Sequence, residues 1–299
     1  MIYTLIEALS GLGMFLFGML YMELALKESA GLRFKSWVKN STSSTSKSLM
    51  TGTIATTLLQ SSSVVTLMTL SFVSASMITL NSGIAVIFGA NVGTTVTSWI
   101  VATLGFKVSI EAFALPMIGA GGLVLVFDPP YKRIITVAKI FVGFGLLFLG
   151  LEFMKTSIES LTGTIDLAKF SNYPLIAFLG IGFILTAIIQ SSSAATAIVL
   201  SALYAHILNF EQAAAMAIGT NIGTTVTAII GAIGGIPDKK RVALAHFIFN
   251  LITAIAAFLI LPFLTQFLMG IQGLQNNPLI ALALFHTLFN VMGIILLLP

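Results

Sequence analysis

The chain has no cysteine among its 299 residues, and only 8% of its residues are charged. The absence of cysteine excludes disulfides, thiolate metal sites and cysteine nucleophiles. The charged fraction is far below that of soluble domains, whereas hydrophobic residues make up 57% of the chain. Its apolar runs repeatedly reach the length that crosses a bilayer, and they lack the roughly ten-residue alternation of barrel strands. We therefore predict an all-α, integral membrane protein.

The balance of charge favours the basic side only slightly, with 14 Lys and Arg against 10 Asp and Glu. An excess this small, placed in loops, indicates topology rather than a nucleic-acid surface. Because basic loops stay on the cytoplasmic side, we predict that residues 33–47 and 239–241 are cytoplasmic loops of a multi-pass protein of the inner (plasma) membrane. The remaining charges are expected near helix ends, where they snorkel or pair: Glu7, Glu23, Lys139, Glu152 and Lys155.

A polar motif occurs twice in this apolar chain. Gln-Ser-Ser-Ser stands at residues 60–63 and again at 190–193, and each copy is followed by Asn-x-Gly-Thr-Thr-Val-Thr, at 91–97 and 221–227. Both pairs are separated by the same 130 residues. A fixed offset of this kind indicates duplication, so we predict one repeat over 1–130, a second over 131–262, and an additional membrane helix over 263–299.

The segments around the two motifs, residues 49–76 and 175–203, are too short for two full spans and too rich in hydroxyls to face lipid. We predict two re-entrant helical hairpins with the motif near each tip, because irregular backbone at membrane depth must be buried in protein. Three true spans then remain per repeat, which inverts the second repeat relative to the first. The Asn-x-Gly-Thr-Thr blocks are expected to interrupt the helices at 81–104 and 210–235, and the glycines repeated near 11–18 and 143–150 to allow close helix contact.

The hairpin tips combine two kinds of binding group. Unpaired N–H groups at a half-helix N-terminus and serine hydroxyls can hold an oxyanion without Lys or Arg. The same hydroxyls, with glutamine and main-chain carbonyls, offer neutral oxygen ligands to sodium. Since neither hairpin core contains an ionisable side chain, bound cations are the expected compensation for an anion's charge.

Two further motifs pair a histidine with an asparagine four residues later, His246 with Asn250 and His286 with Asn290. We expect these histidines to form hydrogen bonds between helices rather than a proton relay. An enzyme would use a motif serine as nucleophile and one of these histidines as base. No Gly-x-Ser-x-Gly elbow is present, and an enzyme has no use for a second, inverted nucleophile, so we predict that the chain is not an enzyme.

The paired Gln-Ser-Ser-Ser segments, the Asn-[Val/Ile]-Gly-Thr-Thr-Val-Thr blocks and the closing His-x-x-Phe-Asn motifs resemble the type II sodium/phosphate cotransporter family in its bacterial form. The resemblance covers essentially the whole chain. It implies a sodium-coupled phosphate transporter that works by alternating access, with substrate and sodium between the hairpins near the midplane. Carried over by position, the residues that contact phosphate would be Gln60, Ser61, Ser62, Ser63, Gln190, Ser191, Ser192 and Ser193. Those that bind sodium or line the site would be Thr57, Asn91, Thr94, Thr95, Thr186, Asn221, Thr224 and Thr225.

The resemblance leaves several points open. Animal members have a large disulfide-bearing loop between the halves, whereas here only residues 128–133 join them. Many bacterial relatives continue into a PhoU-like helical domain, so the end at Pro299 within an apolar run is expected to be a truncation. Sodium is the one metal implied, without an organic cofactor, and a homodimer is one expected assembly in the lipid bilayer. A carrier of another small oxyanion, a phosphate exporter and an anion channel remain as alternatives.

Overall fold

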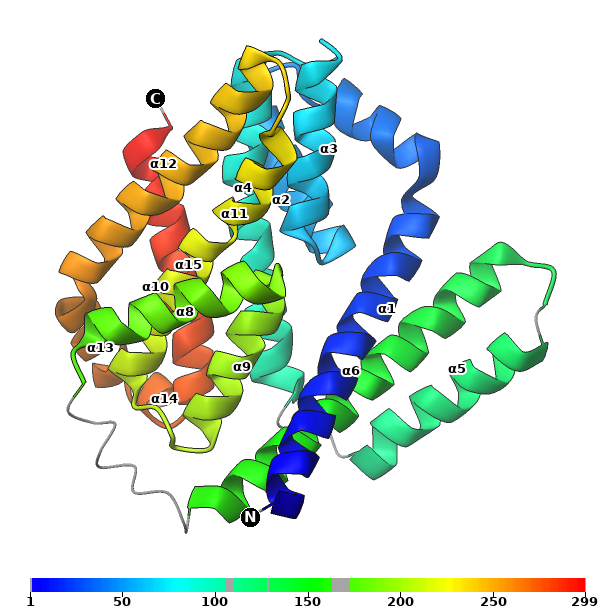
Figure 1. Ribbon diagram of the computed structural model, residues 1–299, viewed down its shortest axis with the longest axis vertical. Helices are drawn as coiled ribbons and strands as arrows, with labels where there is room; N and C mark the ends of the chain where they lie inside the picture. Colours follow the sequence, from blue (N-terminus) through cyan, green and yellow to red (C-terminus); the bar gives the residue numbers. More distant parts are fainter. Residues whose placement is uncertain (1, 106–109, 128, 163–172, 299) are drawn as a thin grey trace.

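The computed structural model describes residues 2–105, 110–127, 129–162 and 173–298. Every regular element in these ranges is helical, which confirms the predicted all-α class (Figure 1). Two short π-helical stretches, Val101–Gly105 and Ile110–Ala114, follow α4 and precede α5. The helices are α1 (Ile2–Asn40), α2 (Thr45–Leu59), α3 (Ser62–Ser74), α4 (Leu80–Ile100), α5 (Leu115–Phe127), α6 (Lys132–Thr162), α8 (Leu175–Ile189), α9 (Ser192–Tyr204), α10 (Phe210–Gly223), α11 (Thr225–Ala232), α12 (Pro237–Leu259), α13 (Leu261–Gly270), α14 (Gln272–Gln275) and α15 (Pro278–Leu297).

Six helical stretches in the described ranges are long and apolar enough to cross a bilayer. They are Ile6–Ser29, Leu80–Gly105, Lys132–Ser157, Phe210–Ala232, Pro237–Leu259 and Pro278–Leu297. A further apolar helical stretch in the described ranges, Ala112–Phe127, is shorter than these six. The bilayer-crossing elements of a helical membrane protein are therefore present, as composition predicted.

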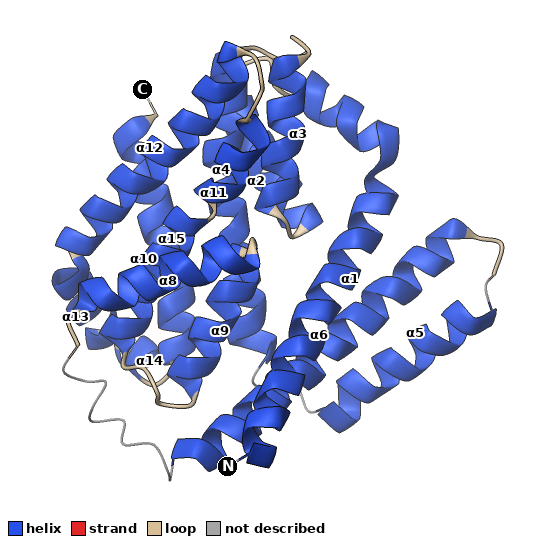
Figure 2. Cartoon of the chain, viewed as in Figure 1, coloured by secondary structure: helices blue, strands red, loops and turns tan. Residues whose placement is uncertain are grey.

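Each Gln-Ser-Ser-Ser segment folds into two short helices joined at the motif. In both halves the first helix has 15 residues and the second has 13, which is too short for either to span. Figure 2 shows the two joining turns close together at mid-height, between the short helices of the two halves. We call residues 60–63 the first tip and residues 190–193 the second tip.

The prediction that the Asn-x-Gly-Thr-Thr blocks interrupt helices is wrong in the first half and right in the second. The helix α4 continues without a break through Asn91, whereas α10 ends at Gly223 and α11 begins at Thr225. In α4 the hydroxyls of Thr94 and Thr95 donate back to carbonyls of their own helix, an arrangement compatible with continued helix.

Glycines bring the neighbouring helices of each half into backbone contact. A Cβ on Gly52 of α2 would lie 1.9 Å from the Val86 carbonyl oxygen, and one on Gly89 of α4 would lie 1.9 Å from that of Leu49. The same contacts recur 130 residues later, at 2.1 Å for Gly182 with Met216 and at 1.9 Å for Gly219 with Leu179. Since no side chain fits at these points, the pairs α2–α4 and α8–α10 must pack glycine to backbone.

The long helices α1 and α6 cross on a second set of glycines. Gly11 lies against Gly150 and Gly18 against Gly143, and a Cβ at any of the four would come within 2.9 Å of the partner helix backbone. Because the lower number in α1 pairs with the higher number in α6, the two helices run antiparallel. The predicted close contact is thus confirmed for these four glycines, whereas Gly13 has open space beside it.

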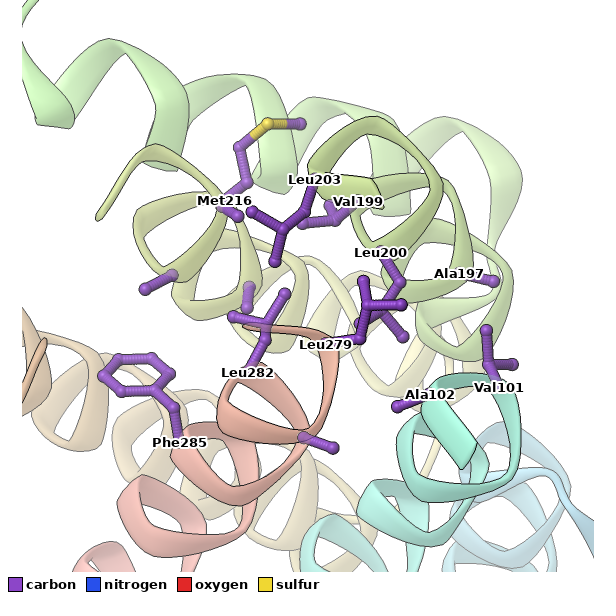
Figure 3. Packing of buried hydrophobic residues seen from close by; sticks show 14 of the residues in the cluster. Val101, Ala102, Ala197, Val199, Leu200, Leu203, Met216, Leu279, Leu282 and Phe285 are labelled. Atoms are coloured by element: carbon purple, nitrogen blue, oxygen red, sulfur yellow. The ribbon is translucent and has the colours of Figure 1, made fainter. Parts of the chain in front are cut away.

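A large apolar cluster fills the second half and links it to the end of α4. Figure 3 shows Leu279 and Leu282 of α15 beside Leu200 and Leu203 of α9, with Ala102 of the first half close by. Burial of such side chains fixes the arms of the second tip against α10 and α15.

The predicted cytoplasmic loops are largely helical. Residues 33–40 belong to the end of α1, beyond a bend at Gly31 (φ 46°), and residues 239–241 lie in the first turn of α12. The reason is amphipathic spacing, since Phe34, Trp37 and Val38 pack on the apolar cluster of the first tip's helices while the basic residues stay exposed. Both segments lie at the upper end of the molecule in Figure 1.

The glycine crossing predicts an asymmetric response to alanine. In Gly18→Ala the new Cβ would meet the Gly143 oxygen at 2.6 Å, so α1 and α6 must separate, whereas Gly13→Ala meets nothing within 4 Å. Overpacking of this kind costs about 1–3 kcal/mol. We expect Gly18→Ala to lower the unfolding temperature in detergent by about 5 °C, with Gly13→Ala unchanged or slightly raised. Equal melting of the two variants would contradict the crossing.

Candidate functional site

The two tips share an unusual backbone turn. Gln60 has φ 53° and Gln190 has φ 58°, in the left-handed region that residues other than glycine rarely adopt. Each glutamine then holds the turn with its side chain, because its Nε2 donates to a carbonyl of the helix it ends, Thr57 at 2.6 Å or Ala187 at 2.5 Å. These carbonyls would otherwise be among the unpaired groups of a helix C-terminus.

The residue after each glutamine begins a new helix. Ser61 Oγ accepts from Val64 N at 3.4 Å, and Ser191 Oγ accepts from Ala194 N at 3.3 Å. The first backbone bonds of α3 and α9 come one residue later, at Val65 and Ala195. The N–H groups of the second and third serines of each motif therefore precede the helical ladder. They point the positive end of a helix dipole at each tip.

One threonine joins the two tips. Thr97 Oγ1 lies 2.9 Å from Gln60 Oε1 of the first tip and 3.3 Å from Ser193 Oγ of the second. Because Thr97 donates its only proton to the glutamine, the Ser193 hydroxyl is the donor in the second contact. The prediction omitted Thr97 and its equivalent Thr227, which donates to Gln190 Oε1 at 2.8 Å. The sequence did mark both residues: each is the last threonine of its repeated block, and the two are separated by the same 130 residues as the rest of the motif.

The two halves are not equally closed around the tips. Ser193 is buried and Gln60 half-buried, whereas Gln190 is exposed. The counterpart of the Thr97–Ser193 contact would join Thr227 to Ser63, and no such hydrogen bond occurs in the described part of the chain. The tips are therefore joined through Thr97 and Ser193, whereas the equivalent contact between Thr227 and Ser63 is not formed among the described residues.

The helix α1 reaches both tips from outside the repeated motif. Ser191 Oγ lies 3.8 Å from Met19 Sδ, and Glu23, one turn further on, interacts with the side chain of Ser61. Residues four apart share a helix face, so one face of α1 covers both tips. The expectation that Glu23 lies near a helix end is wrong, since it sits inside the apolar span Ile6–Ser29.

The predicted residues of the Asn-x-Gly-Thr-Thr blocks lie beside the tips rather than on them. The hydroxyls of Thr94, Thr95, Thr224 and Thr225 donate to carbonyls three or four residues earlier in their own segments. No hydrogen bond between described residues joins them to either tip. Their lone pairs remain free to accept or to bind a cation, but the structure leaves that part of the prediction without a contact.

The other two predicted threonines are not equivalents of each other. The counterpart of Thr186 at the repeat offset is Thr56, not Thr57. Thr56 and Thr186 are both buried, and within the described residues neither hydroxyl has a hydrogen-bond partner. Thr57 is half-buried and contributes its carbonyl to Gln60. Thr56 is therefore the member of the pair that the prediction missed.

A second polar cluster lies between α10, α12 and α15. Asn221 Nδ2 donates to Asn250 Oδ1 at 2.9 Å and to Asn290 Oδ1 at 2.8 Å. These two asparagines in turn donate to the carbonyls of His246 and His286. Asn91 of α4 is also buried, and its Nδ2 has no partner among described residues. Asn221 thus connects the second Asn-x-Gly-Thr-Thr block by hydrogen bonds to both His-x-x-Phe-Asn motifs.

The ring of His286 forms a hydrogen bond within the described residues, whereas the ring of His246 does not. His286 Nδ1 lies 2.8 Å from Ser98 Oγ of α4, which confirms the predicted hydrogen bond between helices. Neither ring nitrogen of His246 has a partner in the described part of the chain. No contact among described residues connects either ring to a motif serine, so the geometry of a serine nucleophile with its base is not formed here.

A cavity of about 520 Å³ lies beside the first tip, between α1 and α3. Its lining includes Leu59 and Val64, which flank the tip, and Lys27 and Lys35 of α1. Both lysines are exposed. The cavity therefore connects a basic surface with the neighbourhood of the tip.

A helical protein with six apolar spans and a duplicated site of serines, amides and helix ends is built like a membrane carrier. The family model described as Na+/Pi-cotransporter matches residues 14–156 and 162–292. The chain belongs to the Na+/Pi-cotransporter family.

Three individual proteins illustrate what the chain is similar to. The uncharacterized protein YqeW of Bacillus subtilis is 33% identical over 85% of this chain and 80% of its own length. The putative inorganic phosphate export protein YjbB of Escherichia coli is 25% identical over 99% of this chain, which spans 53% of that protein. The rat sodium-dependent phosphate transport protein 2C is 40% identical over 75 residues, or 24% of this chain and 12% of its own. No solved structure matches the chain.

The contact between the tips can be tested with engineered cysteines, because the chain contains none. The two hydroxyl oxygens lie 3.3 Å apart, so Thr97→Cys with Ser193→Cys should form a disulfide under mild oxidation. Thr97→Cys with Ser201→Cys is the control, since Ser201 lies about 12 Å further along α9. Peptide mass mapping should find the cross-link in the first pair alone. Its absence there, or equal yield in both pairs, would overturn the arrangement of the tips.

Proposed function

We propose that the chain is a sodium-coupled carrier of inorganic phosphate, with phosphate and sodium bound between the two tips near the membrane midplane. The observation that carries this proposal is the meeting of the tips at Thr97. It brings hydroxyls, glutamine amides and two helix N-termini to one place inside a helical membrane protein.

The chemistry of the tips suits an oxyanion accompanied by cations. The N–H groups of Ser62, Ser63, Ser192 and Ser193 and the serine hydroxyls are donors for phosphate oxygens. No motif residue at either tip is cationic, so an anion bound there has no fixed partner of opposite charge. Sodium ions held by hydroxyl and carbonyl oxygens would supply the balance, and this requirement couples the two solutes.

Several contacts support an inverted repeat and alternating access. The equivalent helices α1 and α6 run antiparallel at their glycine crossing, and the α2–α4 contacts recur in α8–α10. The turn after α3 lies at the upper end of the molecule in Figure 1 and the turn after α9 at the lower end. Two re-entrant hairpins that enter from opposite faces would have this arrangement.

The orientation follows from the basic segments. Residues 33–40 and 239–241 lie at the same end of the molecule in Figure 1, as one cytoplasmic face requires. We therefore assign that end to the cytoplasm and the protein to the plasma membrane. The proposed orientation places the cavity that holds Lys27 and Lys35 toward the cytoplasmic side of the first tip.

The direction of net flux is a separate question, and the similarity to a putative inorganic phosphate export protein of Escherichia coli favours export as a second candidate. Export through the same site needs no other geometry, because a carrier moves substrate in the direction that the summed gradients set. A carrier of another oxyanion and an anion channel are the further alternatives, and each predicts a different outcome in the uptake experiment.

In proteoliposomes, we expect radiolabelled phosphate to accumulate only under an inward sodium gradient, because the anion has no compensating cation otherwise. Potassium replaces sodium in the control. Arsenate, a near isostere, should compete, whereas sulfate should compete weakly, since it lacks the proton that phosphate donates to an acceptor in the site. Equal uptake in sodium and potassium would exclude coupling, and linear uptake without saturation would indicate a channel.

The middle serines of the tips provide the matching mutational prediction. Ser62 and Ser192 are buried, and no side-chain hydrogen bond of either is found among the described residues, so removal of their hydroxyls leaves no protein group unpaired. The Ser62→Ala, Ser192→Ala double variant should lose uptake by about tenfold or more while it stays monodisperse. The control is Ser201→Ala on α9, where the hydroxyl bonds its own helix at Ala197. Full activity in the double variant would make the motif structural.

A further inference from the structure

The proposed carrier site contains an acidic group that lies outside the duplicated motif. Glu23 of α1 is half-buried inside the span Ile6–Ser29, and its side chain interacts with Ser61 and, more weakly, with the charge of Lys27. The other acidic residues with ion pairs in the described part of the chain, Glu28, Glu152 and Asp238, bond Lys139, Lys155 and Arg241 instead. Among the described residues, Glu23 is therefore an acidic side chain that interacts with a serine of a tip instead of with a partner in an ion pair.

A carboxylate beside an anion site raises a problem of like charge. Its repulsion would weaken phosphate binding at the first tip unless a cation lies near both groups. The surroundings of Glu23 favour that cation. The helix α2 ends at Leu59, so the negative end of its dipole meets the same turn, and Ser61 adds a hydroxyl oxygen.

The repeat offers no second copy of this arrangement. At the offset that relates Gly18 to Gly150, the counterpart of Glu23 is Lys155 on α6, a residue of opposite charge. Lys155 lies 3.7 Å from Glu152 and over the ring of Tyr204. At the second tip, α1 instead presents Met19 to Ser191. The two tips therefore differ in charge although their motifs are identical.

We propose that Glu23 is the charged ligand of a sodium ion at the first tip, together with the Ser61 hydroxyl and carbonyl oxygens at the end of α2. The inference rests on the proposed sodium coupling. It places a sodium ion beside the first tip, where the ion would offset both the charge of Glu23 and that of phosphate bound between the tips. The adjacent cavity, whose lining includes Leu59, Val64 and Lys27, lies next to the residues that flank this tip.

Equilibrium binding of 22Na+ to the purified chain tests the assignment without reference to transport. Glu23→Gln keeps the shape of the side chain and removes its charge, so the sodium affinity should fall about tenfold or more. Glu23→Asp should restore part of it. Glu28→Gln is the matched control on the same helix, because Glu28 is exposed and pairs with Lys139 at 2.6 Å. Its sodium affinity should equal that of the unmodified chain.

Phosphate uptake then separates the two proposals. In Glu23→Gln the half-saturating sodium concentration should rise in proportion to the lost affinity, with the phosphate KM at saturating sodium nearly unchanged. Unaltered 22Na+ binding in Glu23→Gln would overturn the role of Glu23, even if sodium still drives uptake. Uptake that ignores sodium in the unmodified chain would overturn the proposed coupling, and 22Na+ binding would still decide the assignment of Glu23. If Glu23→Gln misfolds, Glu23→Asp with unaltered sodium affinity and normal monodispersity would equally overturn the ligand role.

Discussion

The arrangement of the site depends on one local constraint, a left-handed turn at a glutamine between two short helices. A left-handed residue other than glycine costs about 1–2 kcal/mol, and the turn exposes carbonyls of one helix and N–H groups of the next. The glutamine side chain offsets part of these costs. Its Nε2 binds a carbonyl of the helix that ends, and its Oε1 accepts from a threonine of another helix, Thr97 or Thr227. The turn therefore brings the C-terminus of one helix next to the N-terminus of the following helix. The hydrogen bond from Thr97 or Thr227 fixes this turn to another helix.

Close packing of glycine against backbone makes that anchoring possible. Gly93 and Gly223 would place a Cβ 2.7 Å and 2.6 Å from the Cβ atoms of Thr56 and Thr186, one turn before each tip. A side chain there would move the first helix of each pair away from α4 or α10, and Thr97 and Thr227 would lose their distance to the glutamines. The small residues of the Asn-x-Gly-Thr-Thr blocks thus act on the site through helix separation, in agreement with their lack of direct contact with the tips.

The sequence was sufficient where the signal was local or repeated. Composition predicted the helical class, and the duplicated Gln-Ser-Ser-Ser predicted a turn near each motif, because a helix stop and start are encoded by neighbouring side chains. Contacts between segments that lie far apart in the sequence could not be predicted from it. The Glu23–Ser61 interaction depends on how α1 crosses the first tip. The continuity of α4 was equally unpredictable, because Thr94 and Thr95 form the same hydroxyl-to-carbonyl bonds as Thr224 and Thr225, where the helix is interrupted. Residues 33–40 looked like a loop because their charges outweigh the three apolar residues that pack on the first tip's helices.

The two halves carry the same motif but do not form the same contacts, and this difference bears on conformational change. The two halves carry the same tip chemistry, yet Thr97 reaches Ser193 while Thr227 does not reach Ser63. Exchange of these roles would produce a second arrangement with the same types of contact between the tips. A protein with two such arrangements can be shifted by any ligand that binds one of them better. A cation held at the first tip alone would do so, because a charge placed on one side of a pseudo-symmetric site stabilises the two arrangements unequally.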